Sequence, residues 1–121
     1  MTTAANLVVA AVALLHVYFL ILEMFLWTTP TGLRVFSQSR EAAETSKVLA
    51  ANQGLYNGFL AAGLLWGLLL GDAGDGVKVF FLGCVVVAGP YGAATVSRIL
   101  FVQALPAAIG LVLVVARASA G

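Results

Sequence analysis

The chain has 121 residues, of which 62% are hydrophobic and 9% are charged, and its formal net charge is +1. A soluble domain carries about 25% charged residues, so this composition predicts an integral membrane protein. We expect no nucleic-acid partner, because the charge is near zero and no basic patch is present. The single cysteine, Cys84, excludes an internal disulfide and a cysteine metal site.

The first apolar segment predicts a membrane-spanning helix over about residues 5–27. It lacks a basic leading region, and it contains His16 and Glu23, so we expect a retained helix rather than a signal peptide. Trp27 fits an aromatic anchor at the membrane interface. Pro30 cannot continue the helix, so the chain should turn there.

A second and longer helix is predicted over about residues 40–70. Ser39 is a suitable N-cap and Glu41 lies in the positively polarised first turn. Arg40 and Glu44 are spaced to form an i,i+4 ion pair.

Glycines recur on this helix at intervals of four residues, at positions 54 and 58 and again at positions 63, 67 and 71. Such ridges permit close helix contact in lipid. The alternative is that glycine is simply common in membrane helices. The sequence between Gly71 and Gly76 predicts a tight turn.

Two further helices are predicted over about residues 77–96 and 99–117, with kinks at Pro90 and Pro106. The expected fold is therefore all-α: one domain over residues 1–121, built as a bundle of four transmembrane helices. Four basic residues lie on the side of loops 1 and 3, namely Arg34, Arg40, Lys47 and Arg98. Two lie on the opposite side, namely Lys78 and Arg117. This bias places loops 1 and 3 in the cytoplasm and both termini outside the cell membrane.

Polar residues gather in the cytoplasmic half of every predicted helix. On the second helix four of them span an arc of roughly 140°, namely Asn52, Gln53, Tyr56 and Asn57. Antiparallel crossing brings Glu23, Tyr91, Thr95, Arg98 and Gln103 to the same depth. We expect a polar chamber open toward the cytoplasm and closed at its far end by apolar packing.

Glu23 and His16 are the two ionisable residues of the first helix, and they share one face about 10 Å apart. Glu23 either reaches the interface or acts inside the chamber as an acid, a base or a cation ligand. His16 fits a hydrogen-bonded structural residue, a proton carrier or substrate contact, or, as a weaker alternative, an axial haem ligand. We expect no cofactor, and no metal site either, because metal ligands usually occur in clusters.

Several segments carry a family resemblance, namely His16–Tyr18, Leu22–Trp27, Ala51–Ala61, Gly89–Gly92 and Gln103–Pro106. The chain resembles, over nearly its whole length, the small membrane proteins grouped as domain of unknown function 1304. The resemblance implies a four-helix membrane protein and no particular activity. In architecture the chain is also similar to the membrane-associated eicosanoid and glutathione enzymes and to styrene oxide isomerase, which are trimers with sites near the cytoplasmic side. It lacks the arginine-rich motif of the glutathione enzymes and the haem-holding histidine of the isomerase's second helix.

Three functions remain open from the sequence. The first is a membrane enzyme of isomerase or transferase type that acts on or binds a small lipophilic molecule. Its catalytic candidates are Glu23, Tyr56 and Tyr91, and its ligand-binding candidates are His16, Asn52, Gln53, Asn57, Arg98 and Gln103. The second is a proton-coupled transporter with a His16–Glu23 relay, and the third is a structural or partner-binding subunit. In each case we expect a homo-oligomer, specifically a trimer, with glycine ridges as contact surfaces.

Overall fold

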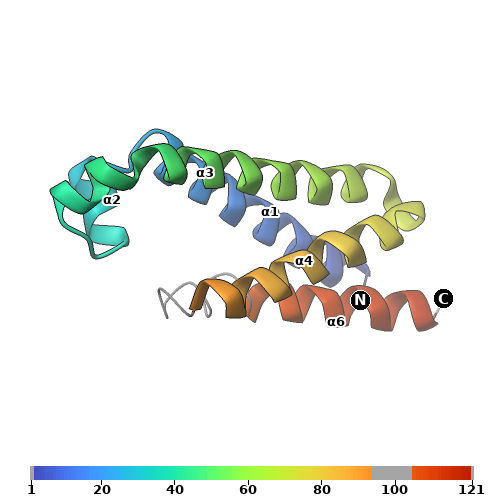
Figure 1. Cartoon of the computed structure of the whole chain (residues 1–121). Coiled ribbons are helices and arrows are strands. Elements are labelled where there is room, and N and C mark those ends of the chain that lie inside the picture. The colour runs from blue at the N-terminus through green and yellow to red at the C-terminus, as the bar shows by residue number, and fades with distance from the viewer. Residues whose placement is uncertain (1, 94–104, 121) are drawn as a thin grey trace. The chain divides into compact units, whose positions relative to one another are not determined.

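The computed structural model describes residues 2–93 and 105–120, with side chains described for residues 2–89 and 105–120. Its elements are α1 (Thr2–Met24), α2 (Pro30–Val35), α3 (Arg40–Leu69), the 3-10 helix η1 (Gly71–Gly74), α4 (Asp75–Ala93) and α6 (Leu105–Ala120) (Figure 1). The all-α prediction is confirmed, and no strand occurs within the described ranges. The helices form two compact units, residues 16–59 and residues 1–15 with 60–121.

Of the described helices, α1 is long and apolar enough to cross a membrane, and α6 is apolar but shorter. The predicted bundle of four membrane-spanning helices therefore stays a prediction.

The first and second predicted helices differ in how well their ends match the structure. α1 ends at Met24, three residues before Trp27, because the backbone N–H groups of Phe25 and Leu26 both bond to the carbonyl of Ile21 and close the helix. α3 spans nearly the predicted range. Its start is confirmed, since the N–H of Ala42 donates to Ser39 Oγ at 3.1 Å.

The short helix α2 lies where the sequence predicts an irregular loop. Thr29 Oγ1 accepts from the N–H of Gly32 at 3.4 Å, and Pro30 provides a pre-set first helical residue. Thr29 Oγ1 also donates to the carbonyl of Leu26 at 2.7 Å. Proline therefore starts a new helix here as well as preventing the extension of α1.

The predicted Arg40–Glu44 ion pair is wrong. Glu44 pairs instead with Lys47 at 3.2 Å, and both side chains are largely exposed. Arg40 Nη1 donates to the carbonyl of Thr28 at 3.3 Å, which joins the start of α3 to the turn after α1. The backbone carbonyl offers Arg40 a fixed partner, whereas an exposed ion pair contributes little.

Glycine and proline residues mark the end of α3 and the start of α6. Gly71, with a φ of +62°, ends α3 in a conformation that suits glycine, and η1 forms the predicted tight turn. Pro106 is the second residue of α6. The residues before Leu105 lie outside the described ranges, so the predicted kink at Pro106 stays a prediction. Residues 94–96 of the third predicted helix and residues 99–104 of the fourth lie outside the described residues.

In the unit of residues 1–15 and 60–121, α4 and α6 pack side by side (Figure 1). Small and branched apolar side chains from the start of α1, the end of α3, α4 and α6 fill its core, namely Ala5, Val9, Val12, Ala13, Leu64, Leu82, Val85, Ala107 and Val114. The glycines near the end of α3 fit this packing. Gly63 lies against the ring of Phe81, and Gly67 lies against Lys78.

A cluster of charged residues lies around the 71–76 turn of this same unit. Lys78 is only 1% exposed, and its Nζ lies 3.2 Å from Asn6 Oδ1, 3.2 Å from the carbonyl of Gly71 and 3.5 Å from Asp75 Oδ1. Arg117 pairs with Asp75 and, at 3.2 Å, with Asp72. Basic residues read from the sequence as topology signals are thus partners of the carboxylates around the 71–76 turn.

The two aspartates provide a test of this charged cluster. We expect Asp75→Asn to destabilise the chain by about 2 kcal/mol, because its side chain is only 19% exposed and holds two cations. Asp72→Asn should cost less than about 1 kcal/mol, since that side chain is 84% exposed. Thermal unfolding in detergent measures both, and equal losses would contradict the assignment.

In the unit of residues 16–59, α1 and α3 approach over two glycines. A Cβ atom on Gly54 would lie 2.6 Å from Met24 Cγ and 3.2 Å from Glu23 Cβ, and one on Gly58 would lie 2.8 Å from Leu20 Cδ1. The glycine ridge predicted from positions 54 and 58 is therefore used inside the chain. It is not free to serve as an oligomer contact.

Gly54→Ala should destabilise the chain by about 1–3 kcal/mol, because the added methyl group overpacks this contact. Gly83→Ala is the matched control, since a Cβ there meets nothing within 4 Å and alanine favours the helix by up to about 1 kcal/mol. The measurement is the unfolding midpoint in detergent. A Gly54→Ala variant as stable as Gly83→Ala would show that α1 and α3 do not approach this closely.

Candidate functional site

Glu23 is the buried carboxylate of the unit formed by residues 16–59. It occupies the last turn of α1, and only 7% of it is exposed. Asn57 of α3 donates a hydrogen bond from Nδ2 to Glu23 Oε1. The structure therefore brings together two of the residues predicted for the site. Gly54, one turn before Asn57, leaves room for this approach.

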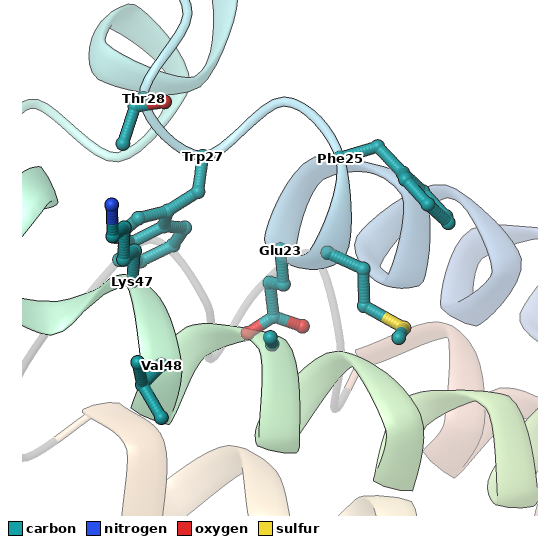
Figure 2. A pocket seen from close by; sticks show the side chains of 8 residues that line it. Glu23, Phe25, Trp27, Thr28, Lys47 and Val48 are labelled. Atoms are coloured by element: carbon teal, nitrogen blue, oxygen red, sulfur yellow. The ribbon is translucent and has the colours of Figure 1, made fainter.

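An open cleft of about 380 Å³ lies beside Glu23. Its lining comes from the end of α1, the turn after it and the first half of α3, namely Glu23, Met24, Phe25, Trp27, Thr28, Lys47, Val48 and Ala51. Figure 2 shows the Glu23 carboxylate reaching toward α3, with Trp27 and Lys47 near one another in the same lining. The cleft thus combines a carboxylate, an ammonium group and apolar walls.

Trp27 is held in a defined position in this lining. Its indole Nε1 donates to Ser46 Oγ at 3.1 Å, and its ring lies 4.8 Å from the ring of Phe36. With its one donor satisfied, the indole offers the cleft an aromatic surface. Because Ser46 and Lys47 are adjacent on α3, this contact also places Lys47 beside the turn.

The other three polar residues predicted on α3 do not reach Glu23. Asn52, Gln53 and Tyr56 are exposed, and the exposed fraction of Tyr56 is 56%. Helix geometry explains the correction. Gly54 and Asn57 face α1, and an arc of roughly 140° is too wide for all four side chains to face one neighbour. These three residues therefore do not contact Glu23, and their predicted roles stay predictions.

His16 is fully buried in this unit, and its ring meets that of Phe19 edge-on at 5.6 Å between centroids. It does not line the cleft. Within the described ranges no group of three or more His, Cys, Asp or Glu residues could hold a metal ion. The haem alternative at His16 and the expectation of no cofactor both stay predictions.

The remaining site predictions concern side chains that are not described. Tyr91, Thr95, Arg98 and Gln103 lie outside the described side chains. Their predicted convergence with Glu23 stays untested.

Three residues of the cleft were not predicted from the sequence to belong to the site. Trp27 was interpreted as an interface anchor and Lys47 as a topology signal, while Ala51 was given no role. A signal for the α3 side of the cleft does exist, because Lys47, Ala51 and Gly54 follow the i, i+4, i+7 spacing of one helix face. For Trp27 no comparable signal exists, since its position depends on α1 ending early and on helix α2.

The cleft has the chemistry to bind a molecule that is mostly apolar and carries one hydrogen-bond donor. A desolvated carboxylate accepts such a bond strongly, particularly from a cationic donor. The same carboxylate is also placed to take up or return a proton of a bound molecule.

Asn57→Ala should destabilise the chain by about 1.5–3 kcal/mol, because it removes the hydrogen-bond donor of a buried carboxylate. Gln53→Ala, an exposed amide on the same helix, should change stability by less than about 0.5 kcal/mol. Unfolding in detergent gives both values. If the two variants lose the same amount, the Glu23–Asn57 contact does not hold α1 and α3 together.

Comparison with known proteins places the chain in a family. A family model described as "Protein of unknown function (DUF1304)" matches residues 10–115. The chain is also 31% identical over 100 residues to the uncharacterized protein YpaA of Lactococcus lactis subsp. lactis (strain IL1403), covering 81% of this chain and 84% of that protein. No solved structure matches the chain. The match over most of the length, together with the relative, shows that the chain belongs to the DUF1304 family.

Proposed function

We propose that this chain is an integral membrane protein whose cleft between α1 and α3 binds a small lipophilic molecule through Glu23. The observation that carries the proposal is the pairing of a buried carboxylate with apolar and aromatic walls in an open cleft. Ligand sites are typically apolar pockets with a few placed polar groups. The bound molecule would place its apolar body along Phe25 and Trp27 and its donor at Glu23.

The membrane placement is supported by the surface of the helices. Large apolar side chains are exposed on every long helix, for example Leu14 at 67%, Leu49 at 70%, Phe80 at 65% and Val112 at 66%. In water so much exposed apolar area would be costly, whereas lipid tails solvate it. α1 is the span best supported by length and composition, and α3, α4 and α6 would provide the other three.

The basic residues around the cleft favour a cytoplasmic opening. Arg34, Arg40 and Lys47 all lie near or between the ends of α1 and α3 that form the cleft. By the positive-inside rule this end faces the cytoplasm of the cell membrane, and both termini lie outside. A lipophilic ligand would enter from the inner leaflet.

A proton-transfer reaction is the enzymatic form of this proposal. Glu23 would remove a proton from one atom of the bound molecule and return it to another, which is an isomerisation that needs no additional reactant. Asn57 would act as a positioning residue, because its hydrogen bond fixes the carboxylate. The cleft also fits simple binding, and the transporter and structural-subunit hypotheses remain alternatives to be separated by experiment.

The binding proposal can be tested with the two tryptophans of the chain. In a Trp66→Phe background, Trp27 reports on the cleft that it lines. Dodecylamine, dodecanol and dodecanoic acid, each brominated at the tail, are titrated into protein in lipid vesicles at equal mole fraction in the lipid. We expect saturable quenching, with the amine bound about tenfold tighter than the alcohol, because a charge-assisted bond to Glu23 is the stronger one.

Glu23→Gln should reduce this preference to about twofold or less, because the neutral amide removes the charge on the acceptor. Glu41→Gln is the control, since Glu41 is an exposed acid in the first turn of α3 and lies outside the cleft. A purely structural role of the cleft predicts quenching that never saturates and does not depend on the probe's polar group.

A further inference from the structure

The cleft that Glu23 lines has a second polar end, which takes no part in the binding proposed above. Lys47 and Thr28 both line the cleft, so an ammonium group and a hydroxyl group belong to its wall. Figure 2 shows Lys47 on the side of Trp27 and Thr28, away from the Glu23 carboxylate. We call Lys47 and Thr28 the basic end of the cleft.

Local contacts concentrate positive charge at the basic end. The carbonyl of Thr28 accepts a hydrogen bond from Arg40 Nη1 at 3.3 Å, which brings a second cation next to a residue that lines the cleft. Ser46, the neighbour of Lys47, accepts from the indole of Trp27 at 3.1 Å, and this bond keeps the start of α3 against the turn. An anion at the basic end would therefore meet two positive charges and a hydroxyl donor.

The ion pair that Lys47 makes is of a kind that an anionic ligand can replace. Its Nζ lies 3.2 Å from Glu44 Oε2, and the two side chains are 58% and 49% exposed. An ion pair with this exposure contributes little to stability, because water and salt screen it. The Glu23 carboxylate, by contrast, is held by Asn57. The cleft thus combines one fixed acceptor with one cation that can change its partner.

Helix geometry gives the distance between the two polar groups. Lys47 lies ten residues before Asn57, the partner of Glu23, which is about 15 Å along the axis of α3. The lysine side chain covers about 6 Å of this length when it points along the cleft. A ligand that reaches both groups therefore needs its own polar groups about 8–12 Å apart. Val48 and Ala51, which lie between these residues on α3, line the cleft with apolar side chains.

We propose that the cleft takes a long-chain acid that carries a hydroxyl group about 8–12 Å from its acidic group. This inference rests on the proposed function and names the class of ligand. The acidic group binds at the basic end, the hydroxyl group donates to Glu23, and the hydrocarbon between them lies on Val48 and Ala51. In the proposed membrane placement Lys47 lies nearer the membrane surface than Glu23, so the charged group stays at the surface while the hydroxyl group lies deeper.

Competition for the cleft tests this class of ligand. Brominated dodecylamine is bound to the Trp66→Phe protein in lipid vesicles, and unlabelled competitors then restore the fluorescence of Trp27. Each bond of an extended hydrocarbon chain spans about 1.25 Å, so a hydroxyl group on the tenth carbon lies about 11 Å from the carboxyl carbon. We expect 10-hydroxyoctadecanoic acid to displace the amine at about one tenth of the mole fraction that its methyl ester or 2-hydroxyoctadecanoic acid requires. The ester lacks the charge, and the 2-hydroxy isomer cannot reach both ends.

Substitution of Lys47 tests the basic end itself. Lys47→Gln should reduce the preference for the acid over its methyl ester to about twofold or less, whereas Lys47→Arg should retain the preference. Arg34→Gln is the matched control and should also retain it, because Arg34 is an exposed basic residue of α2 that does not line the cleft. The preference is a ratio measured within each variant, so a general loss of stability does not imitate the expected result.

The outcomes separate this inference from the proposed function. Saturable binding of the amine with equal displacement by the acid and its ester, or by the two isomers, would overturn the inference alone. A Lys47→Gln variant that keeps the full preference would also overturn it. Quenching by the amine that never saturates would overturn both the proposed function and the inference that rests on it.

Discussion

The hydrogen bond from Asn57 to Glu23 across Gly54 is the interaction on which the candidate site depends. A carboxylate at the end of an apolar helix needs a partner when it leaves water. Asn57 provides that partner, and the missing side chain at position 54 lets α1 approach closely enough to use it. The early end of α1 then turns Trp27 back toward α3, where Ser46 holds it as one wall of the cleft. The site is therefore a consequence of one close helix contact.

In the other unit, formed by residues 1–15 and 60–121, buried charges also have polar or charged partners. Lys78 is buried, and the polar atoms around it come from Asn6 near the start of α1 and from Gly71 and Asp75 in the 71–76 turn. Arg117 completes the cluster from the end of α6. Burial of a charge is tolerated where partners satisfy it, and here one lysine and one arginine join α1, α4 and α6 within this unit. In the part of the chain that the structure describes, buried charged residues thus hold helices together in both units.

Local signals predicted the elements well, because they depend on neighbours in sequence. The Ser39 cap, the Gly71 turn and the extent of α3 follow from side chains that act within a few residues. The meeting of Glu23 with α3 was also predictable, since both lie at the same depth of antiparallel helices. Which of the four polar residues of α3 binds Glu23 was not predictable. Sequence periodicity places all four on one arc of the helix, and only packing against α1 selects Asn57.

The errors share a physical cause as well. Lys47, Lys78 and Arg117 were interpreted through a rule about where basic residues lie across a membrane, which says nothing about their partners. The rule gives the side of a membrane on which a residue lies, whereas the ion pairs depend on which helices pack together.

The central claim is that Glu23 turns inward and is held by Asn57 in the bilayer. Solid-state NMR on the full chain in lipid vesicles measures the separation of the Glu23 side-chain carboxyl carbon and the Asn57 amide nitrogen. The account predicts a separation within about 4 Å, as a direct hydrogen bond requires. A separation beyond about 6 Å would mean that the carboxylate faces elsewhere, and the site would not exist in the form described.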